Sequence, residues 1–472
     1  MSARGGANAG DVVHTTVPPR LDSLEWSRWH VRVVVALGVT WILDGLEASL
    51  VANLGPALQD HRALGLRAAQ VGLASSAYLV GQVVGALGFG RLTDHYGRKR
   101  LFLVTLGLYL AATAASGAAP TFAVFLVLRF FAGAGIGGEY SAINSAIDEL
   151  VPARLRGRVD LAINGSYWVG VGLGAVLTLL LLDPARVPIW LGWRLAFGLG
   201  AVLGLAILFV RREVPESPRW LLLHGHVDEA EATMAHIERA AGQEGRAPPD
   251  AIAVRVTGVA SKRHVLRTLF VRHRRRAVLG MTLMLAQAFL YNAIFFSYGL
   301  ILHTFHHVAP NRVGLYMIPF AVGNFAGPVV LGRLFDRWGR RAMIPATYAI
   351  SGVLLTLTGA AFVLGWLDAT TQTLGWCAVF FFASAAASSA YLTVSELFGV
   401  ELRGVVIAIF YAFGTLAGAA APSLFGRFVD SKDPLHLFEG YALASALMLL
   451  AALVARVYGV ASEGRSLEEL SG

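Results

Sequence analysis

The chain has 472 residues, of which 56% are apolar and only 15% are charged. Soluble proteins carry roughly 25% charged residues, so this composition excludes a soluble globular enzyme and a disordered chain. The formal net charge of +9 would suit a nucleic-acid-binding protein, but it equally suits a membrane protein whose basic residues mark one face. The single cysteine, Cys377, excludes an intramolecular disulfide and a thiolate metal cluster.

Long apolar segments alternate with short polar connections along the chain. A helix of about 20 apolar residues crosses the hydrocarbon core and satisfies its own backbone hydrogen bonds there. The pattern predicts an all-α membrane protein with twelve transmembrane helices. Their expected positions are near residues 31–56, 70–90, 101–119, 121–145, 159–182, 193–211, 277–302, 313–332, 342–366, 373–396, 405–428 and 438–459.

Polar sequence divides the chain into two membrane halves. Residues 1–28 predict a disordered cytoplasmic tail, and residues 29–211 predict an N-terminal half of six helices. The only long polar stretch, 212–276, predicts a cytoplasmic linker with short helices. Residues 277–459 then form a C-terminal half of six helices, followed by a cytoplasmic tail at 460–472.

The basic residues predict which way the chain crosses the membrane. With the N-terminus inside, 31 Lys and Arg residues fall on the inner side and 7 in outer loops. This bias favours an orientation with both termini cytoplasmic, and it accounts for the positive charge without a nucleic-acid partner. Only Lys99, Lys262 and Lys432 are lysines, a bias typical of GC-rich bacterial genomes. We therefore expect a multi-pass protein of the bacterial cytoplasmic membrane.

The two halves carry the same motifs. GRLTDHYGRKR at 90–100 follows the second span, and GRLFDRWGRR at 332–341 follows the second span of the other half. Glu149 precedes Arg156 by seven residues, and Glu396 precedes Arg403 by the same distance. Repeated halves of this kind are typical of transporters that bind a solute between the repeats near the bilayer midplane.

These motifs resemble the major facilitator superfamily, and within it the sugar porter and metabolite–proton symporter branch. Further similar pieces are Arg129 with its following glycines, GGEY at 137–140, PESPRWLL at 215–222 and GRSLEEL at 464–470. The resemblance implies two pseudo-symmetric six-helix halves and a lattice of loop residues that breaks and re-forms during alternating access. The implied gating residues are Gly90, Asp94, Gly97, Arg98, Glu149, Arg156, Gly332, Asp336, Gly339, Arg340, Glu396 and Arg403.

Four ionisable residues lie within predicted spans, where charge is costly and usually functional. Asp44 and Glu47 are three residues apart and so share one helix face, while Arg129 and Glu139 lie in the fourth span. By the resemblance, Asp44 and Arg129 match the Asp and Arg that proton-coupled sugar porters pair. We predict proton-coupling roles for all four, the alternative being permanent structural ion pairs or buried hydrogen-bonded groups.

Polar and aromatic residues in the spans around the centre are candidates for solute binding, although such groups also join helices by hydrogen bonds. Gln287 and Asn292 keep the spacing found in the seventh span of sugar porters, and Tyr391 stands where those proteins have a sugar-stacking Trp. The candidates are Gln287, Asn292, Asn164, Trp168, Tyr291, Asn324, Ser388 and Tyr391.

We therefore predict a secondary active transporter that imports a small polar metabolite (a sugar, a sugar acid or another organic acid) with a proton, by alternating access. An energy-independent facilitator or a proton antiporter is the alternative within this class, and a transporter-like nutrient sensor is the alternative from another class. No catalytic constellation appears in the sequence, so we expect no enzyme, cofactor or metal. The expected partners are the solute, the proton and the lipid bilayer, with no nucleic acid, and we expect a functional monomer.

Overall fold

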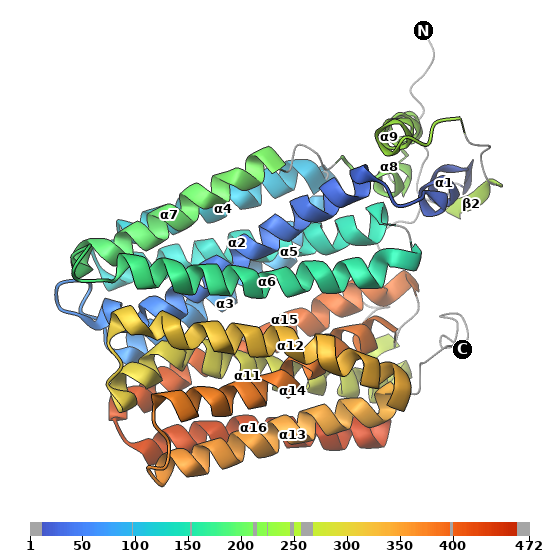
Figure 1. Cartoon of the computed structure of the whole chain (residues 1–472). Coiled ribbons are helices and arrows are strands. Elements are labelled where there is room, and N and C mark those ends of the chain that lie inside the picture. The colour runs from blue at the N-terminus through green and yellow to red at the C-terminus, as the bar shows by residue number, and fades with distance from the viewer. Residues whose placement is uncertain are drawn as a thin grey trace.

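The computed structural model describes residues 12–96, 98–151, 153–210, 215–223, 225–245, 250–255, 268–396 and 400–459. Side chains are not described at some of these positions, mainly near the ends of the long helices. Long helices dominate, and they lie roughly parallel in two groups (Figure 1).

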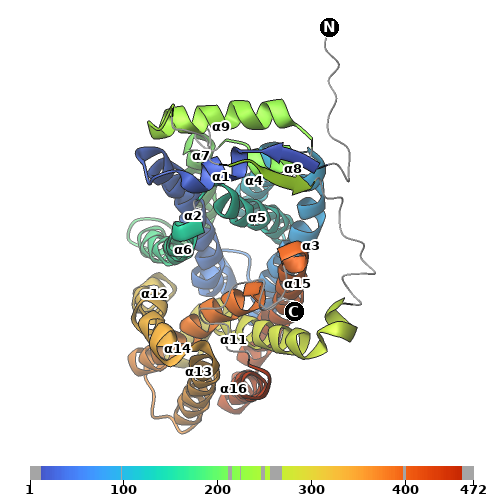
Figure 2. The ribbon, with the colours of Figure 1, turned by 90° about the vertical axis from the view of Figure 1, so that its right-hand side faces the viewer.

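The two groups are the predicted halves. The N half contains α2 (Arg28–Gln59), α3 (Ala68–Tyr96), α4 (Arg98–Gly117), α5 (Phe122–Leu150), α6 (Ala153–Leu181) and α7 (Ile189–Val210). The C half contains α11 (Arg274–His306), α12 (Val313–Trp338), α13 (Arg340–Val363), α14 (Ala369–Glu396), α15 (Val400–Ser431) and α16 (Pro434–Tyr458). Each predicted span overlaps one of these helices, which confirms the predicted fold class. Figure 2, viewed along the helices, shows one half above the other.

Helix length and composition support membrane crossing. Within the described residues, 7 helices are long and apolar enough to span a bilayer, and four shorter apolar helices add to them. Many of their Leu, Val and Phe side chains are exposed on the outer surface of the bundle. Such a surface suits contact with lipid, because lipid chains are as apolar as these side chains.

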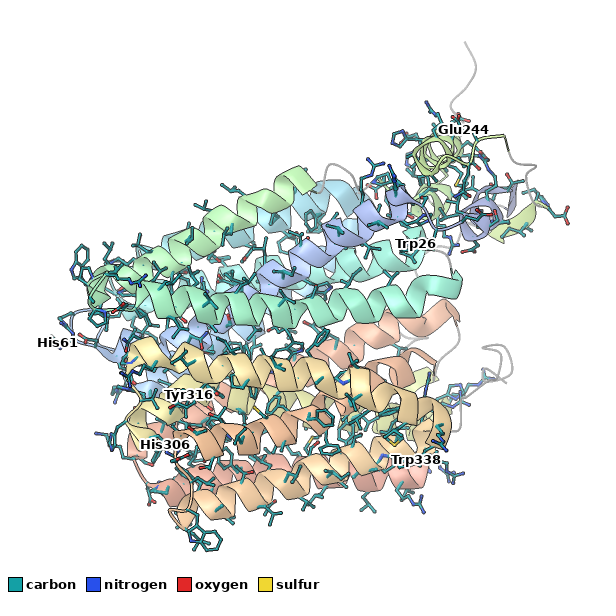
Figure 3. The ribbon with its side chains drawn as sticks, in the orientation of Figure 1. Trp26, His61, Glu244, His306, Tyr316 and Trp338 are labelled. Atoms are coloured by element: carbon teal, nitrogen blue, oxygen red, sulfur yellow. The ribbon has the colours of Figure 1, made fainter. Side chains whose placement is uncertain are left out.

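A small module lies beyond one end of α2, at the upper right of Figure 1. It contains α1 (Val17–Ser23), α8 (Pro218–Leu223), α9 (Val227–Ala241) and the antiparallel strands β1 (Val12–Thr15) and β2 (Ile252–Arg255). We call it the linker cap. The end of the bundle that carries it is the linker end, and the opposite end is the loop end. Figure 3 labels Trp26 and Trp338 at the linker end and His61 and His306 at the loop end.

The N-terminal segment differs from the predicted disordered tail. From residue 12 onward it forms β1 and α1, with Val17 and Leu21 buried. Arg20 lies 2.7 Å from a carboxylate oxygen of Glu231 and 2.5 Å from one of Glu238, both on α9. Val17 and Leu21 share a buried apolar cluster with residues of α8 and α9, and Arg20 pairs with carboxylates of α9. These contacts bind the N-terminal segment to the linker.

Candidate transport site

A fully buried ion pair lies inside the N half. Arg129 on α5 donates from Nη1 to Oε1 of Glu47 on α2 over 2.6 Å, and neither side chain is exposed. The hydroxyl of Thr113 on α4 donates to the same oxygen over 3.1 Å. The other carboxylate oxygen, Oε2, accepts no hydrogen bond from the described residues. One oxygen of Glu47 is thus held by two donors and the other by none.

The remaining contacts of Arg129 also come from the N half. Its Nε and Nη2 donate to Oγ of Ser116 over 3.2 and 2.8 Å. The guanidinium carbon lies 4.7 Å from the centre of the Phe197 ring and 5.7 Å from that of Phe125. Four helices, α2, α4, α5 and α7, therefore surround this cation with one carboxylate, one hydroxyl and two aromatic faces.

The observed partner of Arg129 differs from the sequence-based pairing. The resemblance suggests Asp44, whereas the structure places the carboxylate of Glu47 in contact with the arginine. Asp44 lies one helical turn earlier on α2 and is 2% exposed. Two buried carboxylates and one arginine thus occupy adjacent turns of the N half. The fourth candidate, Glu139, has its side chain outside the described part of the chain.

An aromatic cluster joins the two halves. Trp168 on α6 lies with its ring centre 5.8 Å from Tyr291, 6.4 Å from Phe295 and 6.1 Å from Phe320. Tyr291 and Phe320 also contact Phe380 on α14, at 5.4 and 4.6 Å. Trp168 of the N half therefore contacts three rings of the C half, on α11 and α12, and Phe380 of α14 extends the cluster behind them. Sequence reasoning selected Trp168 and Tyr291 but none of the three phenylalanines.

The predicted polar residues mostly bond within their own helices. Asn292 donates to the carbonyl of Ala288 over 2.8 Å, and Asn324 donates to that of Phe320 over 3.0 Å. Ser388 donates to the carbonyl of Ser384 over 3.1 Å. Of these three side chains, only Asn324 has a buried polar atom, its amide oxygen, that forms no hydrogen bond with the described residues. Each bond uses one of the two amide N–H groups, so Asn292 and Asn324 offer a solute their acceptor oxygens and one remaining N–H each.

Gln287 is 9% exposed on α11, one turn before Tyr291, so it lies beside the aromatic cluster. The side chains of Asn164 and Tyr391 lie outside the described residues. The structure therefore brings Trp168 and Tyr291 together, with Gln287 beside them, while Asn292 and Asn324 bond to backbone carbonyls within their own helices.

At the loop end, the two halves are held in contact by hydrogen bonds between α3 and α15. The carboxylate of Asp430 accepts hydrogen bonds from the backbone N–H groups of Ala68 and Ala69, over 2.8 and 3.0 Å. These groups begin α3 and have no partner within the helix, so Asp430 caps the helix of the opposite half. Two turns further in, the hydroxyls of Ser423 and Ser76 lie 2.7 Å apart.

Glycines let the helix backbones of the two halves touch at the same end. A Cβ on Gly72 would lie 2.1 Å from the carbonyl oxygen of Pro422. The same construction at Gly299 and Gly314 would place a Cβ 2.5 Å from a carbonyl oxygen of the N half, on α2 and α6. The pairs α3–α15, α11–α2 and α12–α6 therefore close the loop end.

The predicted gating residues lie at the linker end. Gly339 joins α12 to α13 with a φ of 80°, a conformation that favours glycine, so the chain turns tightly between the two helices. Gly332 has open space around it, and Arg340 begins α13. Gly97 and the side chains of the remaining candidates fall outside the described part of the chain: Gly90, Asp94, Arg98, Glu149, Arg156, Asp336, Glu396 and Arg403.

Comparisons with known proteins agree with this architecture. The family model described as "Sugar (and other) transporter" matches residues 47–471. The niacin transporter NiaP of Acinetobacter baylyi is 27% identical over 455 residues, which cover 96% of this chain and 98% of that protein. The probable plastidic glucose transporter 1 of Arabidopsis thaliana is 27% identical over 427 residues, covering 88% and 79% of the two chains.

Solved structures share the fold. A D-xylose–proton symporter matches with a TM-score of 0.72 at 18% identity, covering 93% of this chain and 100% of that chain. The inward-open xylose transporter XylE from E. coli matches with a TM-score of 0.71 at 19% identity, covering 93% and 98%. With the repeated motifs, the two six-helix halves and the matched residues together, the chain belongs to the sugar (and other) transporter family of the major facilitator superfamily and is a multi-pass membrane transporter.

Proposed function

We propose that this protein is a proton-coupled symporter of a small planar organic acid, working as a monomer by alternating access, with its linker end in the cytoplasm of a bacterial cell. The observation that carries the proposal is a group of buried ionisable side chains inside the N half. Asp44 and Glu47 are both buried on adjacent turns of α2, and Glu47 forms an ion pair with Arg129 of α5.

The buried carboxylates support proton coupling on simple electrostatic grounds. A charged side chain within a bilayer costs about 2.5–3.5 kcal/mol on insertion scales. The guanidinium group of Arg129 compensates the carboxylate of Glu47, and Asp44 is a second buried carboxyl one turn away, so a proton taken up by either carboxyl would change the charge held inside the bilayer. Loading and releasing that proton would accompany each transport cycle.

The aromatic cluster supports the solute class. Trp168 and the rings of Tyr291, Phe295, Phe320 and Phe380 meet where the halves join, the position at which repeat transporters bind solute. Flat rings stack on one another with a gain of about 0.5–1.5 kcal/mol per pair. Among sugars, sugar acids and other organic acids, a planar acid gains the most binding energy by stacking on these aromatic rings. A relative named as a niacin transporter, matched over nearly its whole length, is consistent with nicotinate as a test solute.

The test is uptake into reconstituted vesicles. We expect labelled nicotinate to accumulate only when the outside is more acidic, and D-xylose, D-glucose and gluconate to compete poorly. Glu47→Gln and Asp44→Asn should each abolish accumulation while keeping exchange of labelled for unlabelled solute, because exchange needs no net proton movement. Glu439→Gln, which removes an exposed carboxylate on α16, is the matched control and should keep both activities.

Each other outcome identifies an alternative. Equilibration of nicotinate with no response to the pH gradient would mean a facilitator, and efflux driven by an inward proton gradient would mean an antiporter. Better competition by the sugars than by the acids would overturn the solute class. Binding of nicotinate without any flux would favour a sensor.

The orientation is tested separately in intact cells. In a Cys377→Ser background, a membrane-impermeant maleimide should label Arg312→Cys, at the loop end, and should not label Arg274→Cys, at the linker end. The reverse labelling would contradict the proposed orientation.

A further inference from the structure

Six arginines at the linker end of the C half are exposed and form no ion pair with the described residues. They lie at the ends of helices, and we call them the C-half rim. The rim consists of Arg272, Arg274, Arg275, Arg337, Arg341 and Arg456. A set of this size, with no carboxylate partner among the described residues, is a concentrated positive surface, and such a surface attracts an anionic partner.

The rim runs around one end of the C half. Arg272 belongs to η2 (Thr268–Arg272), directly before α11, and Arg337 and Arg341 flank the turn between α12 and α13. A Cβ built on Gly459, at the end of α16, would lie 3.7 Å from Cγ of Arg341, so the end of α16 lies beside the start of α13. The positive charges therefore share one level of the bundle.

The linker cap shows the opposite arrangement. Arg20 pairs with Glu231 and Glu238, and Arg219 lies 2.7 Å from a carboxylate oxygen of Asp22. The cap thus neutralises these two arginines internally. The sequence around α11 offers no local carboxylate for the same purpose, because residues 251–335 contain neither Asp nor Glu.

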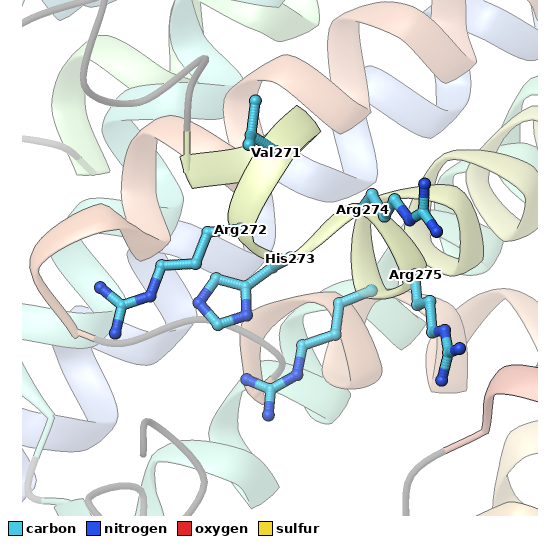
Figure 4. Close-up of a pocket in the computed structure, with 6 residues that line it drawn as sticks. Val271, Arg272, His273, Arg274 and Arg275 are labelled. Carbon is cyan, nitrogen blue, oxygen red and sulfur yellow. The ribbon is translucent and has the colours of Figure 1, made fainter.

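The start of α11 shows how the rim is fixed in place. Leu269 is fully buried, whereas Val271 is 69% exposed, so η2 is anchored on one side and open on the other. Residues 271–276 line a pocket of about 400 Å³, from which the guanidinium groups spread outward (Figure 4). Burial, and then the positive charges of Arg276 and Arg272, lower the pKa of His273 below its usual range. The site is therefore already strongly positive and gains from a negative ligand.

Aromatic side chains mark the same level as a membrane interface. Trp338 is 63% exposed next to Arg337, and Tyr458 is 37% exposed two residues after Arg456. Figure 3 shows Trp338 at this end of the C half. Trp and Tyr collect where lipid headgroups meet the hydrocarbon, because their rings are apolar and their N–H or O–H groups are polar. The rim therefore lies where headgroup phosphates lie.

We propose that the C-half rim binds the phosphates of anionic phospholipid headgroups in the leaflet at the linker end. Guanidinium groups suit this ligand because their planar donors match phosphate oxygens two at a time. The lipids would hold the C half at the interface. The inference does not depend on the solute or on proton coupling.

The test uses the purified full chain in a neutral detergent. Phosphatidylglycerol is titrated in, with phosphatidylcholine as the zwitterionic comparison, and the thermal unfolding midpoint is followed. We expect phosphatidylglycerol alone to raise the midpoint. In the variant Arg272→Gln/Arg274→Gln/Arg275→Gln, the concentration for half of the effect should rise at least about fivefold, since one arginine near an anionic surface contributes roughly that factor.

Two further variants separate lipid binding from other effects of charge. Arg312→Gln/Arg427→Gln/Lys432→Gln removes the same number of exposed cations at the loop end and should respond as the unmodified protein does. Replacing the three rim arginines by lysines should keep most of the response. Equal responses of the unmodified protein and the rim variant would overturn the proposal, as would an equal loss in the loop-end variant. Reproduction of the effect by glycerol phosphate in solution would replace the lipid with a soluble anion.

Discussion

Closure of the loop end depends on the absence of a side chain at Gly72. A Cβ there would lie 2.1 Å from the carbonyl oxygen of Pro422 and 2.9 Å from its carbon. Those atoms are backbone and cannot rotate away. Gly72→Ala should therefore push α3 and α15 apart and shift the protein toward the state that is open at the loop end.

The expected change in the ratio of open to closed molecules follows from the size of this steric overlap. An ordinary contact of this kind needs more than 3 Å, so the backbones must separate by about 1 Å, and overpacking of that extent costs about 1–3 kcal/mol. At about 1.4 kcal/mol for each factor of ten, the ratio of open to closed molecules should rise about 5- to 150-fold. The bonds between Asp430 and α3 would weaken as well, and they add about 0.3–1 kcal/mol for a charge at a helix terminus.

The same helix offers a control. A Cβ on Gly88 meets no atom within 4 Å, so Gly88→Ala adds the same methyl group, and the same gain in helix propensity, without the overlap. Spin labels at Arg67→Cys and Lys432→Cys, in a Cys377→Ser background, report the distance between the halves by pulsed electron resonance. We expect a longer-distance population with Gly72→Ala and none with Gly88→Ala.

Two results would refute this reasoning. An unchanged distance distribution in Gly72→Ala would mean that the close approach at Pro422 does not hold the loop end closed. Equal lengthening in both variants would mean that added helix stability, rather than steric overlap, moves the halves.

Other predictions concern the solute and the cap. Gln287→Ala and Asn292→Ala should weaken solute binding measured by calorimetry, and Gln287→Ala should do so more, because Asn292 already uses one of its two amide N–H groups on Ala288; unchanged affinity in both would place the site elsewhere. Trp168→Ala should weaken binding of a planar acid about 2- to 10-fold, with little effect on a sugar, by losing a stacking contact. Arg20→Ala should speed proteolysis within residues 212–276 without changing transport, and unchanged cleavage would show that its ion pairs do not hold the cap.

The sequence predicted the bundle well because the membrane imposes a simple physical requirement. Each helix must be apolar over about 20 consecutive residues, and such a stretch can be recognised in the sequence without knowing the rest of the fold. The N-terminal segment was not predicted, because the contacts that order it are distant in the sequence. Val17 and Leu21 are too few to form a structure alone. Arg20 pairs with Glu231 and Glu238, which lie more than 200 residues away in the linker.

The ion pair shows a similar limit at the candidate site. The sequence identified Asp44, Glu47 and Arg129. Asp44 and Glu47 lie three residues apart on one helix face, so the pattern alone does not decide which of them pairs with Arg129. Helix packing decides it. The structure directs Glu47 toward Thr113 on α4, next to the arginine, and such contacts between helices have no local signature. The aromatic cluster was found only in part for the same reason.

Placement of the ion pair constrains how a proton could act on the transport path. Every described partner of Arg129 belongs to the N half, so a change at Glu47 does not reach the C half through a direct contact of the pair. Helix α2 provides the connection. It carries Glu47 in its middle and, five residues later, Ala52, whose carbonyl oxygen lies 2.5 Å from the position of a Cβ on Gly299 of α11. Because helix backbones in such close contact cannot slide independently, a shift of α2 on protonation must be transmitted to the loop-end closure.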